Sequence, residues 1–189
     1  MRNSKVRILC ECAVLVAMGT ALAQVKLFRM PSGGSVTLCS MLPFLMIAYR
    51  HGTKWGVLAG AANVLLQIAL GGIYTPPAGT FIALVGEVIL DYVIAYLCLG
   101  FSEFFAKPFG KDKRLAGVMV SSFICCLIRF LSAFLSGFLI WGSITEDGFS
   151  AVIYSLTYNG SYMLPETALT LLVTFFLCKA APKLYARQK

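Results

Sequence analysis

Apolar residues recur along this chain in long runs that are separated by short polar segments. A helix needs roughly 20 residues to cross the hydrocarbon core of a bilayer, and several of the runs have about this length. The segments between them are rich in glycine, proline and charge, which end helices. The pattern predicts an all-α integral membrane protein, a single domain over 1–189 with six transmembrane helices, at 6–28, 36–50, 54–72, 79–106, 114–141 and 150–181.

Two of the predicted connections are expected to be non-helical, because they contain proline and glycine. The first is Pro31-Ser32-Gly33-Gly34, and the second covers 71–77. Irregular backbone is tolerated at membrane depth only against protein or a cavity, so the first connection could fold back into the membrane as a lid. Lys26 and Arg29 lie just before it.

Composition and charge support a chain whose solvent is lipid. Hydrophobic residues make up 59% of the sequence and charged residues only 13%, while the net charge is +8. The basic residues are scattered over short loops and both ends, which does not indicate nucleic-acid binding. With loops on alternating sides, thirteen of sixteen Lys and Arg share one side, whereas Lys26 and Arg29 lie on the other and Arg129 within a span. The positive-inside rule then predicts a bacterial cell-membrane protein with both termini in the cytoplasm.

The first apolar run also imitates a secretory signal peptide. Arg2, Lys5 and Arg7 precede it, and it ends in Ala21-Leu22-Ala23-Gln24, which is similar to a cleavage site. Cleavage would leave five spans and separate the two basic ends. We therefore expect a retained transmembrane helix.

Catalysis, metal binding and cofactor binding are not indicated by the residues. The seven cysteines have no paired metal-ligand spacing and are interpreted as small core residues. The single histidine, His51, is predicted at the cytoplasmic edge without ligands nearby. No Gly-rich phosphate loop with its lysine is present, so energy for active transport would come from a partner or an ion gradient.

Four charged residues fall within predicted spans and are the main functional candidates. A charge at the bilayer centre costs about 2.5–3.5 kcal/mol on insertion scales, so such groups usually face a cavity or a partner. Glu87 and Asp91 are four residues apart and share a helix face, where a bound cation or the protonation of one of them would relieve their repulsion. Arg129 and Glu166 lie in the last two spans. Asp91 and Arg129 occupy similar depths, so a simple ion pair between them is an equally good interpretation.

Aromatic residues gather near the predicted outer ends of the spans. Interfacial anchoring explains many such residues. However, Tyr154 and Tyr158 are four residues apart, and Asn159 beside them has an amide that should avoid lipid. Together with Trp141 and Tyr74 they could form a ring-lined pocket for a flat cationic heterocycle.

Small residues form a stripe along the first predicted helix. Ala13, Ala17 and Ala21 follow at four-residue spacing, which allows another helix to approach closely. Packing inside the bundle and docking of another membrane subunit both fit this pattern.

Several motifs resemble one known family. Pro31-Ser32-Gly33-Gly34-Ser35-Val36 leads into Met41-Leu42-Pro43-Phe44 and Arg50-His51-Gly52. Leu90-Asp91-Tyr92 lies in the fourth span, and Ile153-Tyr154-Ser155-Leu156-Thr157-Tyr158-Asn159 opens the sixth. The chain resembles, nearly end to end, the ThiT or YuaJ family, which are thiamin-specific substrate-binding (S) components of energy-coupling factor (ECF) transporters.

The resemblance implies a six-helix bundle with a thiamin pocket near the outer face. It implies that Asp91 contacts the thiazolium, that Tyr154 and Asn159 are polar ligands, and that Trp141 is an aromatic wall. It also implies docking through Ala13 and Ala17 to a transmembrane coupling protein served by two ATPase subunits. The chain itself would then be a binding subunit and not an enzyme.

The sequence departs from the family pattern at two positions. Ala133 stands where some members have a histidine, and Gly34 where some have an aromatic residue. Another cationic heterocycle or a thiamin precursor therefore stays open as the ligand. A stand-alone ion-coupled carrier that uses Glu87 and Asp91 is the alternative function, although no internal repeat supports it.

Overall fold

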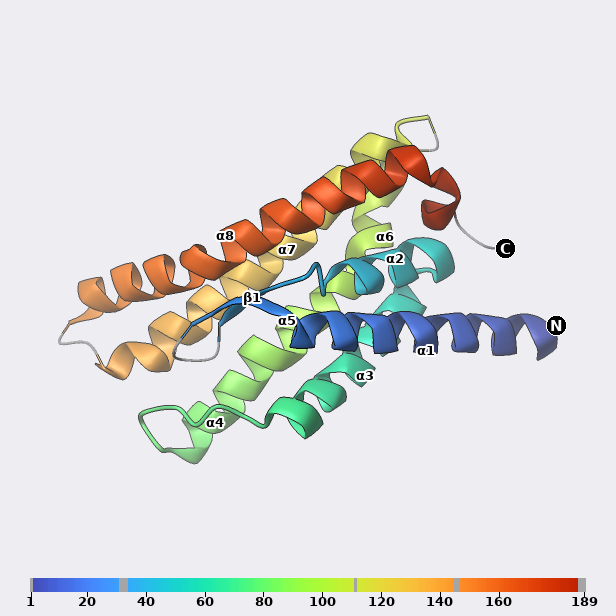
Figure 1. Cartoon of the computed structure of the whole chain (residues 1–189). Coiled ribbons are helices and arrows are strands. Elements are labelled where there is room, and N and C mark those ends of the chain that lie inside the picture. The colour runs from blue at the N-terminus through green and yellow to red at the C-terminus, as the bar shows by residue number, and fades with distance from the viewer. Residues whose placement is uncertain (1, 31–33, 111, 145–146, 187–189) are drawn as a thin grey trace.

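The structure is a computed structural model that describes residues 2–30, 34–110, 112–144 and 147–186, and six helical segments form its bundle. The long helices are α1 (Arg2–Gln24), α3 (Thr53–Gly71), a fourth helix between Phe81 and Phe109, α7 (Arg114–Leu139) and α8 (Gly148–Ala180). The sixth segment is the short α2 (Leu42–His51). Both ends of the chain lie at one end of the bundle, as Figure 1 shows.

The five long helices are each long and apolar enough to cross a membrane. Their outward surfaces carry many large apolar side chains, which a bilayer would cover. In Figure 1, α7 and α8 run side by side along the whole bundle. The prediction of a six-helix membrane protein is confirmed.

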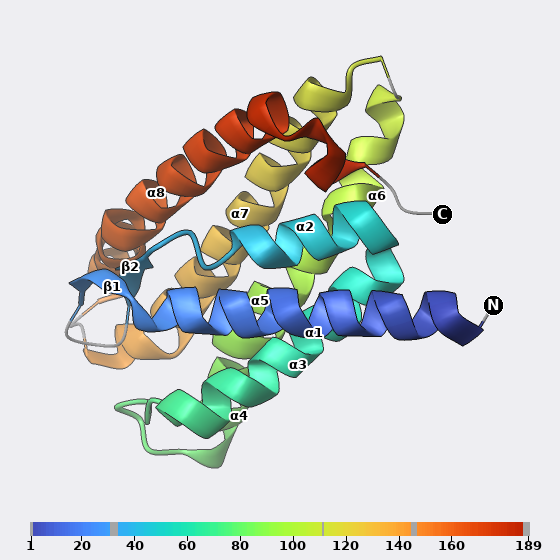
Figure 2. The same ribbon diagram turned by 45° about the vertical axis from the view of Figure 1, so that its right-hand side comes forward.

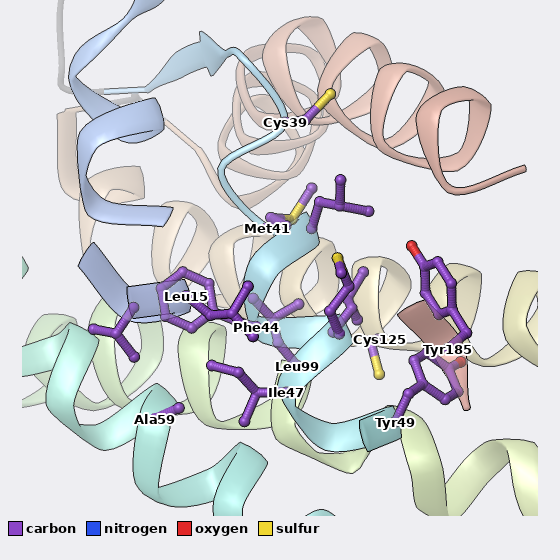
Figure 3. Packing of buried hydrophobic residues seen from close by; sticks show 14 of the residues in the cluster. Leu15, Cys39, Met41, Phe44, Ile47, Tyr49, Ala59, Leu99, Cys125 and Tyr185 are labelled. Carbon is purple, nitrogen blue, oxygen red and sulfur yellow. The ribbon is translucent and has the colours of Figure 1, made fainter. Parts of the chain in front are cut away.

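The short helix α2 supplies many residues of the core, and Figure 2 shows it between α1 on one side and α7 and α8 on the other. Every residue from Leu42 to Tyr49 is buried, so this helix has no lipid-facing side. Figure 3 shows its side chains packed with residues from several other helices, such as Leu15 and Leu99. Because it has only ten residues, α2 is shorter than the predicted span 36–50.

A two-stranded hairpin precedes α2 where the sequence predicted helix. The strands are β1 (Lys26–Arg29) and β2 (Ser35–Thr37), paired antiparallel with Phe28 opposite Val36. Accordingly α1 ends at Gln24 and not at 28. The expected lid residues 31–33 lie outside the described part of the chain.

The fourth helix changes its hydrogen-bonding pattern several times. It consists of α4 (Phe81–Glu87), a π-helical stretch η1 (Val88–Ile94), α5 (Ala95–Leu97), η2 (Cys98–Phe101), α6 (Ser102–Ala106) and η3 (Lys107–Phe109). It crosses α3 so closely that a Cβ on Gly100 would lie 2.4 Å from the backbone of α3. Short π-helical segments often occur at functional sites, and this one carries Asp91.

Polar contacts join several segments at the end of the bundle that holds the termini. Glu11 of α1 forms an ion pair with Arg50, and its other oxygen lies 3.3 Å from Nε2 of the buried His51. The Arg50 guanidinium also donates a hydrogen bond to the Leu184 carbonyl, at 3.1 Å, in η5 (Pro182–Tyr185).

Five of the seven cysteines are buried, whereas Cys10 is exposed and Cys178 is half-buried.

Candidate functional site

A cavity of about 490 Å³ opens between the hairpin, the end of α3, the fourth helix, α7 and α8. These segments place it away from the chain termini, toward the left of Figure 1. Its volume lies in the range of small-molecule binding pockets. Polar and aromatic side chains from several elements converge on it.

All seven residues that the sequence analysis selected for ligand binding line this one cavity: Tyr74, Glu87, Asp91, Trp141, Tyr154, Tyr158 and Asn159. They come from four separate parts of the chain. Tyr74 follows α3, and Trp141 begins η4 (Trp141–Ile144) after α7. The three residues between 154 and 159 lie on α8.

The two carboxylates of the fourth helix enter the cavity from one side. Asp91 accepts a hydrogen bond from the Ser136 hydroxyl of α7. Glu87, one turn earlier, is only 3% exposed, and its Oε2 has no hydrogen-bond partner among the described residues. A buried carboxylate oxygen without a partner is costly, so a cationic or hydrogen-bond-donating ligand would be favoured here.

Asp91 and Arg129 both line the cavity but do not form an ion pair; the ion pairs among the described residues all lie elsewhere. The Arg129 guanidinium lies instead over the Tyr96 ring, 4.5 Å from its centroid, in a cation–π contact. The ion pair that the sequence allowed between Asp91 and Arg129 is therefore not formed in this structure. Both side chains border the cavity, and a contact between Asp91 and a ligand stays a prediction.

The tyrosines of α8 form a continuous aromatic face. The rings of Tyr154 and Tyr158 are stacked with centroids 5.8 Å apart, and Tyr162 meets Tyr158 edge-on at 6.0 Å. Their four-residue spacing puts all three on the same side of the helix. All three tyrosines line the cavity, as do the two carboxylates of the fourth helix.

Asn159 lies at the cavity but uses its amide for contacts within the protein. Its Nδ2 donates to the Ala133 carbonyl of α7 at 3.2 Å and to the Ser155 carbonyl at 3.0 Å, and its Oδ1 accepts from the Tyr162 hydroxyl at 2.8 Å. Gly137 allows this close packing, because a Cβ there would lie 2.8 Å from Nδ2. Asn159 thus joins α7 to α8 and orients Tyr162.

Several cavity residues were missed by the sequence analysis. Tyr92 and Tyr96 line it, one and five residues after Asp91, and Gln67 lines it from α3. Tyr96 is five residues from Asp91, which lies off the same face of a regular α-helix, so α-helical spacing would not have identified it. Nor does the spacing reveal that Thr37 of β2 reaches the cavity, since no hairpin was expected there.

The alanine stripe lies apart from the cavity. Ala13, Ala17 and Ala21 are all exposed on α1, and none of them lines the cavity. Packing inside the bundle is therefore excluded as the reason for this stripe. The surface can receive another helix or lipid.

Membrane-spanning helices around a polar, ring-lined cavity define a membrane protein that binds a small molecule, of the class that includes transport proteins. The family model described as thiamine transporter protein (Thia_YuaJ) matches residues 9–186. The chain belongs to this family of transport proteins, which are not enzymes.

Known relatives align with nearly the whole length of this chain. The thiamine transporter ThiT of Bacillus subtilis is 32% identical over 190 residues, which cover 96% of this chain and 95% of the relative. The thiamine transporter ThiT of Lacticaseibacillus paracasei is 26% identical, and the matched region covers 97% of this chain and 92% of the relative. A solved structure of ThiT from Listeria monocytogenes superposes with a TM-score of 0.76 at 25% identity, covering 97% of this chain and all of the other.

Proposed function

We propose that this chain is the high-affinity thiamin-binding membrane subunit, or S component, of an ATP-driven ECF-type importer. The cavity carries the proposal, because it combines the buried carboxylate of Glu87 and the half-buried one of Asp91 with an aromatic face, in a chain of the thiamine transporter family. Thiamin consists of two flat aromatic rings joined by a methylene bridge, and its thiazolium ring is permanently cationic. The cavity offers complementary groups for each of these properties.

The charge of the ligand would be met by the fourth helix. The Asp91 carboxylate and the Glu87 oxygen that has no hydrogen-bond partner among the described residues both belong to this helix, and both residues line the cavity. Hydrogen bonds to charged groups contribute about 1.5–3 kcal/mol each. We propose that Asp91 contacts the thiazolium and that Glu87 accepts a second hydrogen bond from the ligand.

The rings of the ligand would be met by aromatic side chains. Tyr154 and Tyr158 on α8, Trp141 after α7 and Tyr74 after α3 all line the cavity. Each ring facing a cation contributes about 0.5–2 kcal/mol. We propose that these four residues hold the ligand rings. We also propose that Asn159 contacts the ligand in addition to its hydrogen bond from α8 to the Ala133 carbonyl of α7.

Partner subunits would supply the energy. We propose that the exposed stripe of Ala13, Ala17 and Ala21 docks on a transmembrane coupling protein served by two ATPases. Both termini would lie in the cytoplasm of a bacterial cell, because the basic residues concentrate at that end. The cavity, at the opposite end, would then open outward.

Titration of the purified protein tests the ligand. Trp141 lines the cavity and Trp55 does not, so thiamin should quench fluorescence in the wild type and in Trp55→Phe but not in Trp141→Phe. Thiamin phosphates, the pyrimidine fragment and riboflavin complete the panel. Binding of riboflavin but not thiamin would refute the proposal.

A second assay tests the coupling. Purified protein in liposomes should bind thiamin without moving it when a proton or sodium gradient is imposed. Uptake driven by such a gradient, without partner subunits, would show the ion-coupled carrier instead.

A further inference from the structure

Glu166 of α8 lines the cavity, yet both of its carboxylate oxygens are bound within the protein. The Thr37 backbone N–H donates to Oε2 and the Thr37 hydroxyl donates to Oε1, each at 2.5 Å. We propose that Glu166 is a positioning residue that anchors residues 34–40, here called the wall segment, against α8 and thereby slows the release of bound ligand. The effect on release rests on the function proposed above.

Glu166 differs in this respect from the other carboxylates of the cavity. Asp91 uses one oxygen to accept from Ser136, and Glu87 has an oxygen without a partner among the described residues. Glu166 is equally buried, with 3% of its surface exposed, but is occupied by Thr37. It is thus the carboxylate that serves the cavity wall and not the ligand.

The wall segment needs an anchor because its backbone is locally strained. Cys39 has a φ of 56°, a left-handed conformation that non-glycine residues adopt only when the surrounding structure holds them there. Thr37 and Ser40 flank it, and their hydroxyl oxygens lie 2.7 Å apart. The Ser40 backbone N–H also donates to Thr37 Oγ1, at 3.4 Å. Glu166 therefore binds Thr37, the residue that also forms the hydrogen bonds with Ser40.

The wall segment also forms part of the cavity surface. Gly34, Ser35, Thr37 and Ser40 all line the cavity. Residues of α8 line it as well, so a separation of the wall segment from α8 would open the cavity between them. A contact that keeps the two together should act mainly on the rate of ligand escape.

A second set of contacts holds the other end of the wall segment. The Gly34 N–H donates to the Tyr158 hydroxyl at 3.4 Å, and Gly34 lies so close to Tyr162 that a Cβ would be 2.5 Å from its ring. Glu166 lies about 12 Å farther along α8 than Tyr158, from a rise of about 1.5 Å per residue. The contacts of Gly34 lie at the far end of the wall segment, so they do not replace the two hydrogen bonds between Glu166 and Thr37.

The competing explanation is that Glu166 only balances the charge of Arg129, which lines the same cavity. The two explanations differ in what glutamine can replace. A glutamine side chain at this position has no charge, but its carbonyl can accept from the Thr37 N–H and its amide can donate to the Thr37 hydroxyl. An anchor would survive Glu166→Gln, whereas charge balance would not.

Hydrogen–deuterium exchange of the ligand-free protein tests the anchor directly. Glu166→Ala should raise exchange at the Thr37 amide by about 10-fold or more, as expected for a lost charge-assisted hydrogen bond. Glu166→Gln should stay within about 3-fold of wild type. Thr37→Val removes only the hydroxyl and should have an intermediate effect. Thr170→Val is the matched control, a buried hydroxyl one turn along α8 that does not line the cavity.

Stopped-flow release of thiamin tests the consequence. Glu166→Ala should raise koff by about 10-fold with little change in kon, and Glu166→Gln should largely preserve koff. Equal effects of Ala and Gln, or unchanged exchange at Thr37 in Glu166→Ala and Thr37→Val, would overturn the proposal. If Glu166→Ala does not fold, Glu166→Gln and Thr37→Val still decide the matter. If the wild type binds no thiamin, the proposed function fails, while the exchange data still decide whether Glu166 is an anchor.

Discussion

The negative charge of Asp91 can be removed with almost no change in shape by Asp91→Asn. The contacts of Asp91 in the structure indicate how this substitution should affect stability and ligand affinity. Asp91 has no ion pair with Arg129, and its hydrogen bond from Ser136 can also be accepted by an asparagine oxygen. The substitution should therefore leave the fold stable and remove mainly the attraction for a cationic ligand.

The loss in affinity follows from one charged contact. A hydrogen bond or close contact to a charged group contributes about 1.5–3 kcal/mol, which corresponds to roughly a 10- to 150-fold rise in Kd for thiamin. An uncharged analogue, in which a thiophene replaces the thiazolium, should lose much less. Fluorescence titration and the melting temperature of each variant measure the two quantities separately.

Asp112→Asn is the matched control, because Asp112 is exposed in the loop before α7, at the other end of the bundle. It should change neither affinity nor stability. The reasoning fails if Asp91→Asn weakens both ligands equally. It also fails if stability falls by about 3–5 kcal/mol and Arg129→Met restores it, which is the behaviour of a broken buried ion pair.

Three further predictions address subunit docking at α1, the hydrogen bonds of Asn159 on α8, and the close packing of the fourth helix on α3. Replacing Ala13 and Ala17 together by Trp should abolish uptake in cells but preserve thiamin binding by the isolated subunit, and equal loss of both would contradict docking at this stripe. Asn159→Ala should lower unfolding stability by about 1–3 kcal/mol as well as affinity, since it removes the hydrogen bond to the Ala133 carbonyl of α7 and the one accepted from Tyr162 within α8; an unchanged melting temperature would contradict this. Gly100→Ala should destabilise by about 1–3 kcal/mol because its Cβ would meet the α3 backbone at 2.4 Å, whereas Gly71→Ala, with nothing within 4 Å, should be tolerated in the same thermal assay.

The sequence alone determined the class of protein and identified seven of the residues that line the cavity. Apolar runs of sufficient length predict spanning helices, because in lipid a helix satisfies all of its backbone hydrogen bonds internally. Four-residue spacing placed Glu87 with Asp91, and Tyr154 with Tyr158, on common helix faces. Polar groups on such faces avoid lipid, so both pairs were expected to turn toward the same interior.

Only the tertiary structure decided which partners these groups have. Whether Asp91 meets Arg129 or Ser136 depends on how the fourth helix and α7 are rotated and shifted against each other, and the π-helical stretch changes that rotation. Likewise, the contact between Glu166 and Thr37 joins residues 129 positions apart through a hairpin that the apolar pattern had hidden. Periodicity along one helix fixes which residues share a face. It carries no information on the register between helices, which the packing of the whole bundle sets.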